Sequence, residues 1–187
     1  HLEFPFFEKY LKDKTLSAPA EASVFETGSN SWGTFDAWPP KNLSNRPLYF
    51  HENGSLSFSA PTGGAQYDEY VSDPAKPVPY TESITPRMTI EYMVEDQRFA
   101  SRRPDVLVYQ LPPQEEELVI AGPLDVDLWV TTTGTDADFV VKLIDVFPDN
   151  PDSKTQPGFQ MLLRSEVFRG RFKNSFEKPE PLVPGQP

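Results

Sequence analysis

The sequence predicts an all-β protein, and three observations support this prediction. The 187 residues include 21 prolines and 10 glycines, which interrupt the chain often and favour short strands over long helices. Strand-like runs recur with turn residues between them, a spacing typical of a two-sheet sandwich or jelly roll. Two such runs fall within residues 123–147, and this stretch is predicted to be the centre of the fold.

Residues 123–147 are predicted to form a hairpin of two strands. In the first strand every second residue from Leu124 to Val130 is apolar, so one face is expected to lie in the core. The second strand, 139–146, carries bulky side chains on both faces, as an interior strand does. The connection contains Gly134, which can take a positive φ, and aspartates that favour turn hydrogen bonds.

Residues 3–12 are predicted to form a short amphipathic helix. Its apolar side chains recur at spacings of three and four residues, and Glu8, Lys9 and Lys12 lie on the polar side. Residues 14–21, KTLSAPAE, have the composition of a linker. We therefore expect this helix to belong to a body that precedes the β domain, and to need a partner for its apolar face.

The other strands are predicted from the alternation of their residues and the turn residues that bound them. Their ranges are 23–26, 33–37, 48–51, 56–59, 105–111, 115–121 and 159–168. Asn53-Gly54, between two of these runs, is the strongest local signal for a hairpin. Residues 66–80 contain three prolines, which suits an edge or surface crossing. A second short helix is predicted over 89–100 and ends before Pro104.

Composition and charge exclude several classes of function. A net charge of −11 and a pI of about 4.6 oppose binding to phosphate backbones, so we expect no nucleic-acid partner. The chain has no cysteine, which excludes disulfides and thiolate metal sites. No apolar run reaches the ~20 residues of a membrane-spanning helix. The first residues lack the features of a signal peptide, and the compartment is left open.

A search for a hydrolase site finds no nucleophile and base in the chain. The Gly-x-Ser-x-Gly pentapeptide of a nucleophile elbow is absent, and the nearest sequence, 29–33, is interpreted as a turn. The two histidines are His1 at the terminus and His51 beside a predicted hairpin, where we expect a surface strand residue. A histidine-based catalytic triad is therefore not predicted within this chain.

Acidic pairs and tryptophans have a functional and a plainer interpretation. Asp125 and Asp127 share one strand face, and Asp136 and Asp138 share a turn, so either pair could contribute ligands to a cation. The calcium-loop pattern is absent, and we favour a solvated face and turn capping, with no metal or cofactor. Residues 149–152, DNPD, are equally consistent with a solvated loop.

The three tryptophans, Trp32, Trp38 and Trp129, are expected to fill the core. A sugar-stacking platform made by Trp32 and Trp38 is the alternative. Exposure distinguishes the two, because a coplanar exposed pair would support sugar binding and burial of both indoles would not.

A series of short motifs follows one order along almost the whole chain. The motifs are Pro5-Phe6-Phe7, Tyr10-Leu11-Lys12, Glu26-Thr27-Gly28, Trp38-Pro39-Pro40, Tyr70-Val71-Ser72-Asp73-Pro74, Asp96-Gln97-Arg98, Arg103-Pro104-Asp105-Val106 and Arg169-Gly170-Arg171-Phe172. The most specific block is 134–146, GTDADFVVKLIDV. In this joint order the chain resembles the C-terminal β domain of the X-Pro dipeptidyl-peptidase, cocaine-esterase and α-amino-acid ester hydrolase family of serine hydrolases.

The resemblance implies a particular fold and domain organisation. Residues 1–14 would be the terminal helix of an upstream α/β-hydrolase domain, 15–21 a linker, and 22–187 a galactose-binding-like jelly roll that lacks its last strands. In the family the Ser-His-Asp triad lies in the α/β-hydrolase domain, so it falls outside this chain. The chain alone is then expected to be inactive, and the parent to be periplasmic or secreted.

The resemblance also implies an accessory function, in which the domain braces and partly walls the active site of an acyl hydrolase. The partner would be the α/β-hydrolase domain of the parent, whose substrates would be X-Pro peptides, α-amino-acid esters or other acyl esters. The expected interdomain contacts are Phe6, Phe7, Tyr10, Asp96, Arg98 and Arg103. A stand-alone carbohydrate- or ligand-binding jelly-roll module is the alternative.

Overall fold

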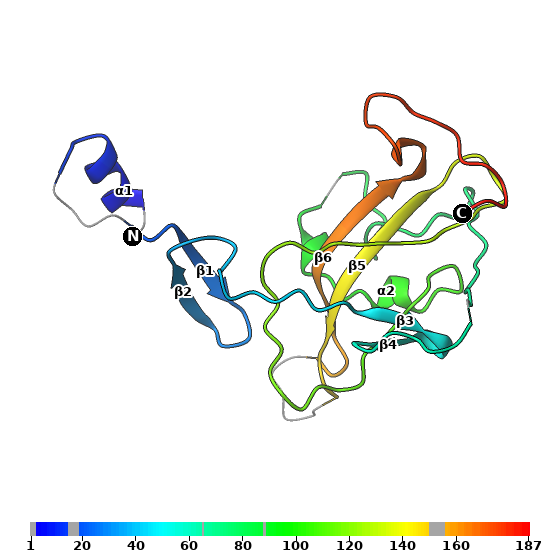
Figure 1. Ribbon diagram of the computed structural model, residues 1–187, viewed down its shortest axis with the longest axis horizontal. Helices are drawn as coiled ribbons and strands as arrows, with labels where there is room; N and C mark the ends of the chain where they lie inside the picture. The colour runs from blue at the N-terminus through cyan, green and yellow to red at the C-terminus, as the bar shows by residue number, and fades with distance from the viewer. Residues whose placement is uncertain (1–2, 15–18, 65, 88, 150–155) are drawn as a thin grey trace. The chain divides into compact units, whose positions relative to one another are not determined.

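The protein is described by a computed structural model that covers residues 3–14, 19–64, 66–87, 89–149 and 156–187 (Figure 1). The chain divides into two compact units. Unit 1 consists of 1–48 and 112–126, and unit 2 of 49–111 and 127–187. Among the described residues, strands contain more residues than helices do, which confirms an all-β domain at this level.

Unit 1 contains one helix and one hairpin. Helix α1, Glu3–Tyr10, confirms the helix expected near the start of the chain. Its first turn carries Glu3 and its last turn Lys9, charges that suit the two ends of the helix dipole. Strands β1, Ala22–Glu26, and β2, Ser31–Phe35, pair antiparallel, so the second strand begins two residues earlier than predicted.

Unit 2 begins with the hairpin that Asn53-Gly54 predicted. Strands β3, Tyr49–His51, and β4, Ser55–Ser57, pair antiparallel across a 3₁₀ turn, η1, Glu52–Gly54. Both turn residues have positive φ, 60° at Asn53 and 67° at Gly54, as a tight hairpin turn requires.

The longest ladder joins β5, Asp138–Val146, to β6, Gln160–Arg169. The predicted hairpin within 123–147 is therefore wrong, because β5 pairs with the strand that follows it and 124–131 forms no strand. Alternation identified an extended segment correctly, but alternation alone does not specify which segment is its partner. A one-residue bulge interrupts the ladder: Leu143 lies opposite Arg164 and Ile144 opposite Leu162.

Two further predicted strands and one predicted helix are also wrong. Residues 105–111 contribute only an isolated bridge at Gln110, and 115–121 form no strand. The helix expected over 89–100 is reduced to η2, Glu91–Met93, and α2, Arg98–Ser101. The physical reason lies between these two turns, where the backbone amide of Gln97 donates to the carbonyl of Gln160 at the start of β6.

The C-terminal segment lies against the residues that precede β5. After β6 the chain makes a 3₁₀ turn, η3, Gly170–Phe172, and returns. Backbone amides of Leu182 and Gly185 donate to the carbonyls of Thr135 and Thr132 at 2.8 and 2.9 Å. These bonds satisfy two carbonyls of the segment that was expected to connect the two strands of the hairpin.

Few apolar side chains are buried in this structure. Among the described residues, Ala100 and Leu162 are the buried apolar side chains. The face of 124–130 that was expected to be core is partly exposed, with Leu124 at 49% and Val126 at 40%. Large apolar areas of both units are therefore accessible.

A buried amide, Gln97, joins the helical segment to the β5–β6 ladder. Its side chain is 1% exposed, and its Nε2 donates to the carbonyls of Glu95 at 2.9 Å and Tyr92 at 3.4 Å. Its Oε1 accepts a hydrogen bond of 2.7 Å from Nζ of Lys142 on β5. Burial lowers the pKa of Lys142, and the charge of Glu95 opposes this effect.

We predict that Gln97→Met destabilises the domain by about 2–4 kcal/mol, because it removes these bonds and leaves a half-buried ammonium without its acceptor. The double variant Gln97→Met/Lys142→Met should cost less than the sum of the single variants, with a coupling of about 1–2 kcal/mol. Urea denaturation measures both values. The matched control is Gln114→Met, which removes an exposed amide and should change the unfolding free energy by less than about 0.5 kcal/mol. Additive effects at positions 97 and 142 would contradict the network.

We also predict that Gly54→Ala destabilises the domain by about 2 kcal/mol, because the new Cβ would lie 2.6 Å from the carbonyl oxygen of Val108 at a positive φ. The control is Gly63→Ala, where a Cβ meets nothing within 4 Å. Thermal unfolding of both variants checks the prediction, and equal midpoints would refute it.

Candidate functional site

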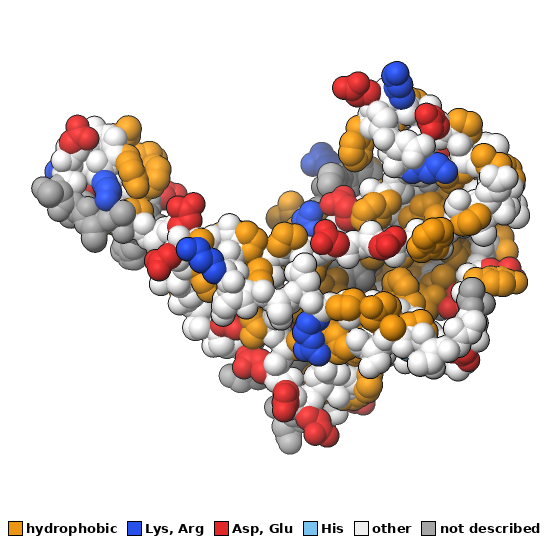
Figure 2. All heavy atoms as spheres, in the orientation of Figure 1, with side chains coloured by type: hydrophobic (Ala, Val, Ile, Leu, Met, Phe, Trp, Pro, Cys, Tyr) orange, Lys and Arg blue, Asp and Glu red, His pale blue; other side chains and the backbone are white. Residues whose placement is uncertain are grey.

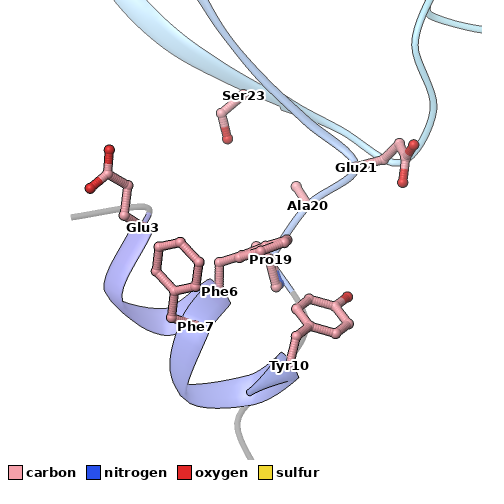
Figure 3. Close-up of a pocket in the computed structure, with 8 residues that line it drawn as sticks. All are labelled: Glu3, Phe6, Phe7, Tyr10, Pro19, Ala20, Glu21 and Ser23. Carbon is pink, nitrogen blue, oxygen red and sulfur yellow. The ribbon is translucent and has the colours of Figure 1, made fainter. Parts of the chain in front are cut away.

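Helix α1 carries an exposed aromatic surface, made by Phe6, Phe7 and Tyr10. Each of the three rings is about half exposed, from 47% for Phe6 to 54% for Tyr10. Phe6 contacts both neighbours, with ring centroids 5.5 Å from Phe7 and 4.8 Å from Tyr10. The rings face a hollow of about 410 Å³ within unit 1 (Figure 3). The other lining residues are Glu3, Pro19, Ala20, Glu21 and Ser23.

Ion pairs connect the polar side of α1 to the residues that follow the helix. Glu8 is buried at 4% exposure and forms ion pairs with Lys12, at 2.6 Å, and with Lys14. Hydrogen bonds from these two lysines outweigh burial and lower the pKa of Glu8. Glu8 thus has its partners close by in the chain, whereas the aromatic surface has no equivalent ion-paired cover among the residues of unit 1 that the structure describes.

Two of the charged residues expected at an interdomain contact lie together in unit 2. Asp96 Oδ2 accepts a hydrogen bond of 2.6 Å from Nε of Arg98, and Asp96 Oδ1 accepts the backbone amides of Arg98 and Gln160. Burial raises the pKa of Asp96, but these hydrogen bonds outweigh it, so the pKa is lowered overall. Arg98 also donates to the carbonyl of Pro157 at 3.2 Å.

The third charged residue, Arg103, lies in a separate pair. Its guanidinium donates to both carboxylate oxygens of Asp105, at 2.7 and 2.6 Å, and to the carbonyl of Lys76. The hydrogen bond from Arg103 lowers the pKa of Asp105. Arg98 and Arg103 each tie distant loops together within unit 2, and a role in contacting another domain stays a prediction.

The tryptophans are exposed, so the expectation that they fill the core is wrong for this structure. Trp32 is 66% exposed, Trp38 42% and Trp129 87%. Trp32 contacts Phe25 across the β1–β2 hairpin, whereas Trp38 contacts Phe35, both at 5.4 Å between ring centroids. Within the described residues no ring contact joins Trp32 to Trp38, so they do not form one shared platform.

The acidic pairs act in local ion pairs or face solvent. Asp136 pairs with Arg171, and Asp138 pairs with Arg169 at 3.3 Å. The hydrogen bond from Arg171 lowers the pKa of Asp136. Within the described ranges, no group of three or more His, Asp or Glu side chains is placed to hold a metal ion. Part of 149–152 lies outside those ranges.

The serine and histidine candidates make structural contacts. Ser29 lies in the β1–β2 turn and donates to the carboxylate of Glu26 at 3.0 Å. His51 Nε2 lies 2.9 Å from the carbonyl oxygen of Ser59. His1 lies outside the described residues. In the part of the chain that the structure describes, no helix is long and apolar enough to cross a bilayer.

Sequence reasoning missed Gln97 and Lys142 as a joined pair. A signal was available in each case: Gln97 stands between two charged residues in the Asp96-Gln97-Arg98 motif, and Lys142 is the one cation in a mostly apolar strand that also contains Asp138 and Asp145. A lone lysine in such a strand indicates a buried acceptor, but its identity follows only from the three-dimensional contacts.

These observations define a β-rich domain whose described residues bring no nucleophile beside a base. The family model described as "X-Pro dipeptidyl-peptidase C-terminal non-catalytic domain" matches residues 15–187. The chain belongs to this family, and its relatives make it an accessory C-terminal domain of esterase- and peptidase-like proteins.

Comparisons with known proteins support this assignment. The chain is 27% identical over 193 residues to cocaine esterase from Rhodococcus sp. (strain MB1 Bresler), covering 97% of this chain and 32% of that protein. Its structure is similar to that of an aminopeptidase from the marine sediment archaeon Thaumarchaeota archaeon, with a TM-score of 0.86 and 38% sequence identity. The match covers 100% of this chain and 31% of that protein. It is also similar to an α-amino acid ester hydrolase, with a TM-score of 0.86 and 40% sequence identity, and the match covers 100% of this chain and 32% of that protein. The chain thus spans about a third of the length of these relatives.

We predict that the Asp96 carboxylate stabilises unit 2 at neutral pH and loses this effect in acid. A lowered folded-state pKa means that the contribution is complete above the ordinary carboxyl pKa and disappears as the pH falls through the folded value. The unfolding free energy of Asp96→Asn should therefore lie below that of the original chain at pH 7, and the difference should shrink toward pH 3. The control is Asp125→Asn, an exposed carboxylate, for which we expect a small difference at both pH values. A constant difference at position 96 across this range would contradict the assignment.

Proposed function

We propose that this chain is the accessory C-terminal domain of an acyl hydrolase, an X-Pro dipeptidyl-peptidase or an α-amino-acid ester or acyl esterase. The aromatic surface of α1 carries the proposal, because Phe6, Phe7 and Tyr10 are half exposed on a helix whose polar side is already satisfied. Membership of a family of non-catalytic C-terminal domains supports a catalytic partner domain in the same parent protein, and we propose that this partner is an α/β-hydrolase domain.

The proposed organisation places residues 1–14 with the α/β-hydrolase domain as its terminal helix. Residues 15–21 form the linker, of which 15–18 lie outside the described residues, and 22–187 form a jelly roll. Covering three half-exposed aromatic rings would contribute on the order of 1–2 kcal/mol per ring. This is enough to hold two domains together when it acts with polar contacts at the rim.

In this proposal the chemistry belongs to the partner domain. A serine attacks the acyl carbonyl, a histidine takes its proton, and backbone amides stabilise the oxyanion. The contribution of this chain is to brace that site and to wall part of it, which excludes water and restricts the acyl group.

A binding module is the second candidate, because Trp32 is exposed beside Phe25. Glu26, Ser29 and Ser31 form a hydrogen-bonded group at the same hairpin turn. An aromatic face next to hydroxyl and carboxylate groups suits a sugar. Titration of the chain with oligosaccharides, compared with Trp32→Ala, tests this candidate.

We predict that the chain alone does not hydrolyse alanyl-prolyl p-nitroanilide or p-nitrophenyl acetate, and that adding the α/β-hydrolase domain of the parent gives turnover. Replacing Phe7 by serine should weaken the association of the two domains by roughly ten- to hundredfold, since it removes apolar contact area. The control is Trp32→Ala, an exposed aromatic residue of β2 that does not line the hollow at α1, and it should leave the association unchanged. Turnover by the chain alone that is lost in His51→Ala would show that a catalytic site exists within these residues.

A further inference from the structure

A second apolar surface lies in unit 2, on the loop made by residues 79–87 and 89–94, here called the 79–94 loop. Its aliphatic side chains are the feature of interest, because Ile84 is 105% exposed and Ile90 86%. Val94, Met93 and Tyr80 on the same loop are 69%, 52% and 49% exposed. Isolated exposed apolar residues are ordinary, but several on one short loop mark a contact surface.

The base of the 79–94 loop is fixed by specific interactions. The rings of Tyr80 and Tyr92 lie 4.6 Å apart at an interplanar angle of 34°. Burial and a hydrogen bond between the two hydroxyls raise the pKa of Tyr80. The carbonyl of Tyr92 accepts a hydrogen bond from the buried amide of Gln97, which connects the loop to the β5–β6 ladder.

The tip of the 79–94 loop is also folded on itself. Thr81 is 7% exposed, and its hydroxyl donates to the carbonyl of Ser83 at 2.9 Å. Thr85 makes a similar bond to the carbonyl of Arg87. Residues 79–87 curve around an open hollow of about 760 Å³. Side-chain hydrogen bonds thus hold the loop in a shape that presents isoleucines to the outside, which lowers the entropic cost of binding a partner.

Figure 2 shows further hydrophobic side chains of unit 2 in the region of α2, β3 and β4, which are made by other residues than the 79–94 loop. Charges on the 79–94 loop are few and of both signs: Glu82, Arg87 and Glu91. The loop thus combines exposed aliphatic side chains with a few charges of both signs, as the core and rim of a protein–protein interface do.

Net charge limits the identity of the partner. Association of two copies would bring together two chains that each carry a charge of −11, which opposes a dimer. The relatives are about three times as long as this chain, so they contain additional polypeptide that can cover such a surface.

We infer that the 79–94 loop docks, through Ile84 and Ile90, on an apolar surface of the α/β-hydrolase domain of the parent, as a second contact apart from α1. This inference rests on the proposed function and adds a specific surface to it. Ile84 and Ile90 are covered in the assembled parent and exposed in the free chain. The loop is then a preformed part of the interface rather than a surface loop.

Cysteine labelling tests the inference, since the chain itself contains no cysteine. Ile84→Cys, Ile90→Cys, Phe7→Cys and Val71→Cys are made singly, in the free chain and in the full-length parent. Each variant is alkylated with a maleimide, and the rate at the labelled peptide is followed by mass spectrometry. Val71 is the matched control, an aliphatic residue of unit 2 that is 82% exposed and lies outside the loop. Phe7→Cys reports on the α1 contact.

In the parent, labelling at positions 84 and 90 should slow by at least about tenfold relative to the free chain, whereas the rate at position 71 should stay the same. Protection at position 7 without protection at 84 and 90 would overturn the inference and leave the proposed function standing. Absence of protection at positions 7, 84 and 90 together would overturn both this inference and the proposed function. Equal protection at position 71 would refute a specific role for the loop. Protection in the free chain that rises with its concentration would identify a second copy as the partner, contrary to the inference.

Discussion

The hydrogen bonds of one buried amide hold unit 2 together. Gln97 accepts from Lys142 on β5, donates its backbone amide to β6 and donates its side chain to the turn that precedes it. Its neighbour Asp96 accepts the backbone amide at the start of β6, and Arg98 fixes that carboxylate. Since few apolar side chains are buried, these polar contacts carry more of the organisation than in a domain with a large core.

The accuracy of the sequence predictions follows the range of the interactions involved. The α1 helix and the hairpin at Asn53-Gly54 were predicted correctly, because spacing and turn residues act over a few positions. The pairing of β5 with β6 was not predicted correctly, because the partner of a strand is determined by contacts between residues distant in sequence. The exposure of the tryptophans was missed for a related reason, because the burial of an aromatic side chain depends on residues distant in sequence that pack over it. The ion pair of Asp96 and Arg98 lay in a visible motif, but its partners on β6 were not visible.

This domain differs from an ordinary soluble domain in the amount of apolar surface that it leaves accessible. An ordinary soluble domain covers most of its aromatic and branched aliphatic side chains. Here Trp129, Ile84, Ile90 and the α1 rings remain in contact with solvent. The chain belongs to a family of non-catalytic C-terminal domains, and our proposal assigns these surfaces to contacts with the rest of a larger protein.

The bulge in the β5–β6 ladder places one extra residue in β6 relative to β5. Leu163 is the extra residue, since Leu143 faces Arg164 and Ile144 faces Leu162. Deleting that one residue would give an uninterrupted ladder in which Leu162 still lies opposite Ile144, so the strand would keep the same faces. What would be lost is the bend and extra twist that a bulge gives its strand, and this would move the backbone groups of Gln160 relative to Asp96 and Gln97. The bulge therefore sets the direction of β6 rather than the choice of side chains that it buries.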